Sequence, residues 1–160
     1  HEKYLNQIPW EDTRDQLNLR YQVQNMDNYP WSKKDKTCNG CFAAGINFGA
    51  SIISLLYGEA DLKETIKIGT LAGWDSDNPT STWGGLIGFM IGKEKIEEIF
   101  GREFSSRFNI HRTRKGFSNQ GIDNFRNMAL KGQSIVDRVV LKKMAGVIDT
   151  INNKWLIPID

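Results

Sequence analysis

The sequence predicts an all-α fold, and three observations support this prediction. Apolar and small residues fill almost the whole circumference of a helix over residues 42–57. Helix-starting signals precede two further apolar stretches, at Asp61 and at Asn78. Glycines recur within these stretches, and small contact residues let neighbouring helices approach closely. We therefore expect a tightly packed helical bundle, followed by a small β-hairpin at the C-terminus.

The composition fits one compact domain and limits the classes of partner. The chain has 160 residues, of which 39% are apolar and 25% charged, and its net charge is +2. So small a net charge removes the electrostatic case for a nucleic-acid partner. The apolar stretch 41–57 is about 17 residues long, the short limit for a bilayer span, and polar residues and glycines interrupt it, so we expect no membrane span. The chain begins at His1 without a signal sequence, which indicates a fragment or a processed product and leaves the compartment open.

Three consecutive parts make up the predicted domain, which spans residues 1–160. Residues 1–40 are polar and rich in turn-forming residues, which predicts a loop-rich lead-in with one short helix near 11–20. Residues 41–92 contain the three most apolar helices. Residues 93–160 complete the chain with charged helices and the hairpin.

The central helices are predicted from their starting signals and their glycines. Asp61, with Glu64 three residues later, has the spacing of a capping box and opens a helix that we expect over Leu62–Ala72. Its core-facing residues are expected to be Leu62, Ile66, Gly69 and Ala72. The next helix is expected to begin near Pro79, with Asn78 as its N-cap, and to end at Ile91.

The C-terminal part is predicted to contain two helices and a hairpin. A charged helix is expected over residues 93–100, and a longer one over 123–144, with Gly132 as a possible interruption. The tail 147–159 alternates around Asn152 and predicts the small hairpin.

The most informative motif is the segment Gly73-Trp74-Asp75-Ser76-Asp77-Asn78, between two apolar helices. Carboxylates at positions i and i+2 of an extended loop project to one side, and Asn78 adds a third oxygen, so the three side chains could bind Mg²⁺. The alternative is that Asp75 and Asp77 only accept hydrogen bonds from loop and helix N-terminal amides.

This segment resembles the ADP-ribosylglycohydrolase family, which has a Gly-x-Asp-x-Asp-Thr segment followed by a glycine-rich helix. The matching stretch here is 72–88, and the preceding stretches 44–49 and 55–61 look like the family's helix and its LLYG-x-x-D turn. The resemblance covers residues 41–92 clearly. It continues through 112–114 and 135–140 in a bacterial branch of the family.

The resemblance implies an all-α fold with a binuclear Mg²⁺ site that binds the ribose next to the scissile bond. It places Asp75 and Asp77 as metal ligands, and Asn78 where the family usually has a ligating Thr. The family's other ligands and its acidic catalytic residue lie in an N-terminal half, which nothing upstream of Asp75 matches. We therefore expect the N-terminal half of the same fold to be a partner, in the same or in another chain, and the isolated chain to be inactive.

The complete protein is expected to be a Mg²⁺-dependent hydrolase that cleaves the glycosidic bond of ADP-ribosyl groups on a protein or a small conjugate. Two alternatives remain open. One is a non-catalytic homologue that binds ADP-ribose or is purely structural, which Asn78 in place of Thr favours. The other is a different metal-dependent glycoside or nucleoside hydrolase. The linkage that would be cleaved is also open.

Three further features are candidates for function. Asn47 could reach the site as a substrate-binding residue, or be a buried, hydrogen-bonded Asn. Arg112 and Arg114 could bind a pyrophosphate, although a short basic connector is usually only solvated. Cys38 and Cys41 have the spacing of a zinc or redox pair, but without a second pair we interpret them as ordinary thiols beside a helix start.

Overall fold

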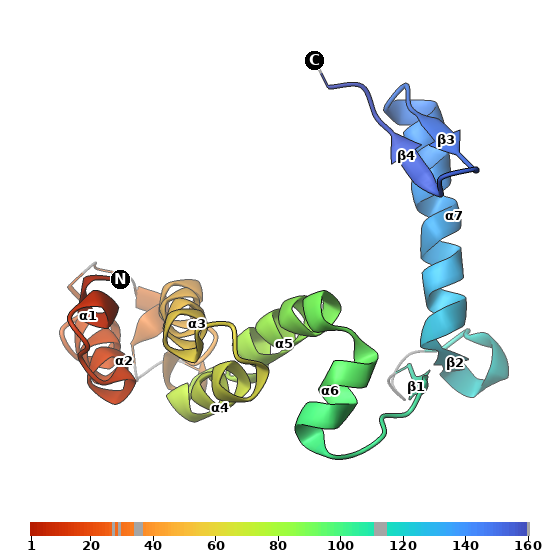
Figure 1. The fold of residues 1–160 in the computed structure, drawn as a ribbon. Coiled ribbons are helices and arrows are strands. Elements are labelled where there is room, and N and C mark those ends of the chain that lie inside the picture. Colours follow the sequence, from red (N-terminus) through yellow and green to blue (C-terminus); the bar gives the residue numbers. More distant parts are fainter. Residues whose placement is uncertain (27, 29, 34–36, 111–114, 160) are drawn as a thin grey trace. The chain divides into compact units, whose positions relative to one another are not determined.

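The structure, a computed structural model, describes residues 1–26, 28, 30–33, 37–110 and 115–159. This part of the chain contains seven α-helices and two small antiparallel sheets (Figure 1). The mostly helical fold with a C-terminal hairpin is thereby confirmed. The chain divides into two compact units, His1–Arg102 and Glu103–Asp160, which are described separately. The single domain expected from the sequence stays a prediction.

Unit 1 begins with short helices where a loop-rich segment was expected. These are α1 (Glu2–Leu5), α2 (Trp10–Asn18), a π-helical turn (Leu19–Val23) and two 3₁₀ segments (Pro30–Ser32 and Thr37–Gly40). The short helix predicted near residues 11–20 is confirmed by α2. Glu11 and Asp12 lie in its first turn, where negative charge interacts favourably with the helix dipole.

Helix α3 (Ala44–Gly58) is the buried helix expected from the apolar stretch. A Cβ atom added at Gly49 would lie 2.6 Å from Cδ1 of Leu17, so the glycine lets α2 approach closely. At Gly45 such an atom would lie 3.4 Å from the ring of Tyr21. The N-terminal segment therefore packs closely against these glycines, and this packing compensates for their low helix propensity.

One stretch of the described residues, Cys38–Gly58, is long and apolar enough to cross a membrane by length and composition. Core helices of soluble proteins have the same properties, and α3 contacts α2, α4 and α5 in unit 1.

Helix α4 (Leu62–Ala72) has the predicted bounds and the predicted cap: Oδ1 of Asp61 accepts a 2.8 Å hydrogen bond from the amide of Glu64. Three of its four predicted core residues are buried. Ile66, by contrast, is only half-buried, whereas Thr65 and Ile68 are buried. The face that packs on α3 is therefore rotated slightly from the predicted one.

Helix α5 (Asp77–Ile91) begins earlier than predicted, with Ser76 as its N-cap. The prediction that Asn78 is the N-cap is wrong, because Asn78 lies inside the first turn. Pro79 is then the third helical residue. The first amides of a helix have no intrahelical partner, so a proline is tolerated there and does not mark the first helical residue.

Helices α3, α4 and α5 contact one another and form the packed centre of unit 1 (Figure 1). A Cβ atom at Gly69 of α4 would lie only 3.1 Å from Cγ2 of Thr80 on α5, so this glycine permits a close helix contact. Helix α6 (Lys93–Phe100) follows and confirms the predicted charged helix. Together these contacts fix the turn between α4 and α5, which carries the acidic motif.

Unit 2 is built around one helix with a hairpin at each of its ends. Its elements are β1 (Arg107–Asn109), β2 (Ile122–Asn124), α7 (Phe125–Lys143), β3 (Val147–Asp149) and β4 (Lys154–Leu156). The β3–β4 hairpin confirms the prediction, with Ile148 opposite Trp155. The β1–β2 hairpin, with Phe108 opposite Asp123, was not predicted. Helix α7 continues through Gly132 without an interruption.

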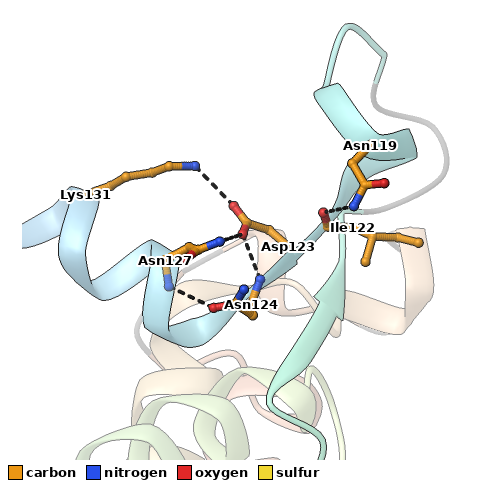
Figure 2. A network of polar contacts seen from close by, with 6 residues as sticks. All are labelled: Asn119, Ile122, Asp123, Asn124, Asn127 and Lys131. Atoms are coloured by element: carbon orange, nitrogen blue, oxygen red, sulfur yellow. Dashed lines mark hydrogen bonds and ion pairs between the residues drawn. The ribbon is translucent and has the colours of Figure 1, made fainter.

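A polar network joins β2 to the first turns of α7 (Figure 2). Oδ1 of Asn124 accepts a 2.8 Å hydrogen bond from the amide of Asn127 and caps the helix. The Asp123 carboxylate accepts hydrogen bonds from the amide of Asn124, from Nδ2 of Asn127 and from Nζ of Lys131. These bonds lower the pKa of Asp123 from its ordinary value, the bond from the Asn124 amide most of all.

Candidate functional site

The acidic motif lies in the turn between α4 and α5. Gly73 and Trp74 have positive φ angles of 92° and 56°, and they redirect the chain after α4. The carbonyl of Asp75 then accepts a 3.0 Å hydrogen bond from the amide of Asn78. The extended loop predicted for Asp75 and Asp77 is therefore wrong, because a turn follows Asp75 and Asp77 is already the first residue of α5.

The turn nevertheless brings the predicted side chains together. A hydrogen bond between the carboxyl groups of Asp75 and Asp77 raises the pKa of Asp75, and partial burial and the charge of Asp77 act in the same direction. A weaker, opposite effect comes from a hydrogen bond with the Asn78 side chain. The start of α5 thus brings the carboxyl groups of Asp75 and Asp77 together, and the side-chain amide of Asn78 donates a hydrogen bond to Asp75.

Such a cluster can bind a proton or a small cation. Two neighbouring carboxylates repel each other when both are ionised, and a shared proton or a divalent cation relieves this repulsion. Among the described residues, no group of three or more His, Cys, Asp or Glu side chains could hold a metal ion. The cluster offers two carboxylates, and Asn78 directs a side-chain N–H to one of them. This set suits Mg²⁺, which keeps several water molecules and needs only one or two protein carboxylates.

Asn47 positions this turn from helix α3. Its side chain is 9% exposed, and its Nδ2 donates to the carbonyls of Cys41 and Ala43. Its Oδ1 accepts a 3.1 Å hydrogen bond from the amide of Asp75. The geometry matches the buried, hydrogen-bonded alternative, and a contact between Asn47 and a substrate stays a prediction.

Gln22 forms a second connection to the turn, one that the sequence does not indicate. Its Oε1 accepts a 3.1 Å hydrogen bond from Nε1 of Trp74, and its Nε2 donates to the carbonyl of Asn39. Gln22 lies in the π-helical turn after α2, more than 50 residues before Trp74. A single glutamine in a polar segment carries no signal of such a distant contact.

Cys38 and Cys41 form a disulfide, so the interpretation of these residues as ordinary thiols is wrong. Cys38, Asn39 and Gly40 all have positive φ angles, and this tight turn brings the two Cα atoms within 5.3 Å of each other. That separation lies in the usual range for disulfides. The two-residue spacing was the signal that could have indicated this pairing.

The basic connector lies mostly outside the described residues. Arg112 and Arg114, the predicted pyrophosphate-binding residues, are both outside them, as is His111. Their contact with a pyrophosphate stays a prediction.

Comparisons of the chain with protein-family models, with curated proteins and with solved structures found no match. The resemblance to the ADP-ribosylglycohydrolases therefore depends on the sequence motifs alone, over residues 41–92 and through 112–114 and 135–140.

Proposed function

We propose that this chain supplies part of the Mg²⁺ site of a hydrolase that cleaves the glycosidic bond of ADP-ribosyl groups. Asp75 and Asp77 bind the cation, and Asn78 contributes an amide oxygen. The observation that carries the proposal is that the turn places Asp75 directly before a glycine-rich helix whose first residue is Asp77, where the neighbouring Asp77 carboxyl raises the pKa of Asp75. The order of these elements is the order of the family motif that the segment resembles.

The electrostatics of the pair support a cation. The neighbouring carboxyl of Asp77 raises the pKa of Asp75, so the pair holds a proton more tightly than an isolated aspartate does. A divalent cation held by the two carboxylates would take the place of that proton and remove the repulsion. Because protons and Mg²⁺ compete for the same oxygens, the proposed binding weakens as the pH falls.

Side chains around the turn keep these ligands in place. Asn47 fixes the backbone amide of Asp75, and Gln22 fixes the indole of Trp74. Both residues come from elements that precede α4, so the turn is held from outside its own two helices. A site whose ligands are held by surrounding hydrogen bonds loses less entropy on binding a cation.

The remaining ligands and the catalytic acid belong, in this proposal, to an N-terminal half of the same fold. Two large apolar residues of α5, Phe89 and Met90, are not covered by the other helices of unit 1, which fits a helix that packs against a further part of the fold. A bound cation pair would hold the ribose hydroxyls, orient the anomeric carbon and stabilise the developing charge. The role of Asp75 and Asp77 would be to fix the position of the cations.

Calorimetry of the chain tests the proposal. Mg²⁺ and ADP-ribose are titrated separately and together into the wild-type chain and into Asp75→Asn with Asp77→Asn. We expect ADP-ribose to bind only with Mg²⁺ present, and the double variant to bind neither. The matched control is Glu11→Gln with Asp12→Asn, which removes two exposed carboxylates in the first turn of α2 and should bind as the wild type does.

Other outcomes assign the alternatives. Binding of ADP-ribose that depends neither on Mg²⁺ nor on the two aspartates would indicate a non-catalytic ADP-ribose binder. Binding of ribose nucleosides as tight as that of ADP-ribose, with Mg²⁺ required, would indicate a nucleoside hydrolase. If neither Mg²⁺ nor ADP-ribose binds to the chain, the result would contradict the proposal that Asp75 and Asp77 form a half-site that binds these ligands without the partner half.

A further inference from the structure

The Cys38–Cys41 disulfide is open to solvent on one side only. Cys38 is exposed, whereas Cys41 is buried with 8% of its surface accessible. A thiolate from solution can therefore reach Sγ of Cys38 more readily than Sγ of Cys41. Exposed disulfides are the ones that exchange with external thiols, because attack requires access along the sulfur–sulfur bond.

The turn closed by this disulfide has an unfavourable backbone conformation. The φ angles of Cys38, Asn39 and Gly40 are 55°, 51° and 75°, and the left-handed region is disfavoured for Cys38, whereas asparagine and glycine tolerate it. Gly40 lies against Ser32: an added Cβ atom would be 2.5 Å from the Ser32 carbonyl oxygen. Once the disulfide opens, no covalent link holds this conformation.

Two carbonyls of this turn are connected to the acidic motif by side-chain amides. The carbonyl of Asn39 accepts from Gln22, whose Oε1 accepts from Nε1 of Trp74. The carbonyl of Cys41 accepts from Asn47, whose Oδ1 accepts from the amide of Asp75. Each amide group thus joins one residue of the disulfide turn to one residue of the acidic turn.

We propose that the Cys38–Cys41 disulfide is a thiol–disulfide exchange site for a dithiol reductant, and that its reduction releases the turn of Trp74 and Asp75. The proposal concerns the conformation of unit 1 and does not depend on the hydrolase assignment. In this reaction the disulfide is the group that the dithiol reduces.

The reaction is a balanced exchange. One thiolate of the dithiol attacks Sγ of Cys38, the bond between the two protein sulfurs breaks, and Cys41 leaves with the electron pair and takes up a proton. The second thiolate of the reductant then attacks its own sulfur in the mixed disulfide and releases Cys38 as a thiol. Two electrons and two protons pass from the dithiol to the chain, and the reductant becomes a disulfide.

Reduction acts on the acidic turn through the two carbonyls. When Cys38 relaxes from positive φ, the peptide planes of the disulfide turn rotate, and the carbonyls of Asn39 and Cys41 no longer face their donors. Gln22 and Asn47 then lose one of their fixed partners. Gln22 keeps only its bond with Trp74, and Asn47 keeps its bonds with the Ala43 carbonyl and the Asp75 amide. Both amide groups lose a contact that holds them in place, so their hydrogen bonds with Trp74 and Asp75 become weaker.

Nuclear magnetic resonance of the full chain tests this coupling. The oxidised chain is treated with dithiothreitol, and its thiols are counted while the indole and backbone amide signals are followed. We expect two thiols per chain, shifts of the Trp74 indole and the Asp75 amide, and hydrogen exchange at Asp75 that is about tenfold faster. The internal control is the indole of Trp83, which donates to the Ser51 carbonyl and should not shift.

Two variants separate the steps. Cys38→Ser with Cys41→Ser should show the signals of the reduced chain and no response to dithiothreitol. Gln22→Ala should remove the redox response of Trp74 and leave that of Asp75. If the double variant does not fold, the comparison of oxidised and reduced wild type still decides the question.

The proposal is overturned if full reduction leaves both the Trp74 and the Asp75 signals unchanged, or if the disulfide reacts only when the whole chain unfolds. The rate of reduction is also measured with reduced thioredoxin at the same dithiol concentration, so that a protein dithiol is compared with a small one. Faster reduction by thioredoxin indicates a protein dithiol, and faster reduction by dithiothreitol indicates a small one.

Discussion

The backbone amide of Asp75 donates a 3.1 Å hydrogen bond to Oδ1 of Asn47, which precedes it by 28 residues in the chain. The acidic turn is thus anchored to helix α3, outside the two helices that it joins. Asn47 is nearly buried and also donates to the carbonyls of Cys41 and Ala43. One side chain therefore satisfies three backbone groups from two separate turns, and its replacement should affect both.

Asn47→Ala should lower the free energy of unfolding of unit 1 by about 1–3 kcal/mol, because it leaves the Cys41 carbonyl and the Asp75 amide without their side-chain partner, whereas the Ala43 carbonyl still accepts from the backbone amide of residue 47. Urea denaturation followed by tryptophan fluorescence measures this change. The signal reports mainly on unit 1, which contains four of the five tryptophans of the chain: Trp10, Trp31, Trp74 and Trp83. The control Gln16→Ala removes an exposed amide from α2 and should change the free energy by less than about 0.5 kcal/mol. Equal effects of the two variants would contradict the anchoring role.

The acidic pair makes a prediction about titration. Because the contact with Asp77 raises the pKa of Asp75, Asp77→Asn should return that pKa toward its ordinary value of 3.8. Carboxyl-carbon resonances followed against pH measure the change directly. A carboxyl whose pKa is raised in the folded chain stabilises the fold at low pH, and this stabilisation is lost as the pH rises through the raised value. The variant should therefore lose less stability than the wild type as the pH rises from about 3 to 6. An unchanged Asp75 titration would show that the two carboxyls do not interact.

Elements with local signals were predictable from the sequence. The spacing of Asp61 and Glu64 fixed the start of α4, because a capping box involves residues only three positions apart. The β3–β4 hairpin was equally predictable, because one short turn joins its strands.

Features that depend on distant residues were not predictable. The β1–β2 hairpin pairs Asn109 with Ile122 across a long connection, and three-residue strands carry little alternation. The carboxyl pair of the candidate site was visible as a motif, but its supports, Gln22 and Asn47, were not. Their partners are identified only once α2, α3 and the turn after α4 are packed together.

Replacement by alanine should have opposite effects on the free energy of unfolding at two glycines of unit 1. A Cβ atom at Gly58 would overlap Oγ1 of Thr65 and lie 2.6 Å from its Cα, so Gly58→Ala should force α3 and α4 apart. We expect a loss of about 1–3 kcal/mol in the free energy of unfolding. At Gly85 an added Cβ atom would meet nothing within 4 Å, so Gly85→Ala should gain about 0.5–1 kcal/mol from helix propensity. The two variants serve as each other's control in urea denaturation. A stabilising Gly58→Ala would contradict the close contact of α3 with α4.

The carboxylate of Asp123 should make the start of α7 sensitive to acid (Figure 2). Its pKa is lowered from 3.8, first by the hydrogen bond from the Asn124 amide and then by those from Asn127 and Lys131. A lowered pKa in the folded chain means that the stabilisation is present above the ordinary pKa and is lost as the pH falls through the lowered value. Hydrogen exchange of the first α7 amides, corrected for intrinsic rates, should therefore show weaker protection at about pH 2.5 than at pH 6.

Asp123→Asn separates the charge of this carboxylate from its shape. An asparagine at this position still offers an oxygen to the Asn124 amide, but it has no charge for Lys131 and cannot titrate. The variant should therefore lose the difference in protection between pH 6 and about 2.5 at the start of α7. Lys131→Met removes only one of the three donors, and not the largest cause of the lowered pKa, so it should keep most of that difference. If Asp123→Asn kept the full acid sensitivity, another carboxyl group would control the start of α7.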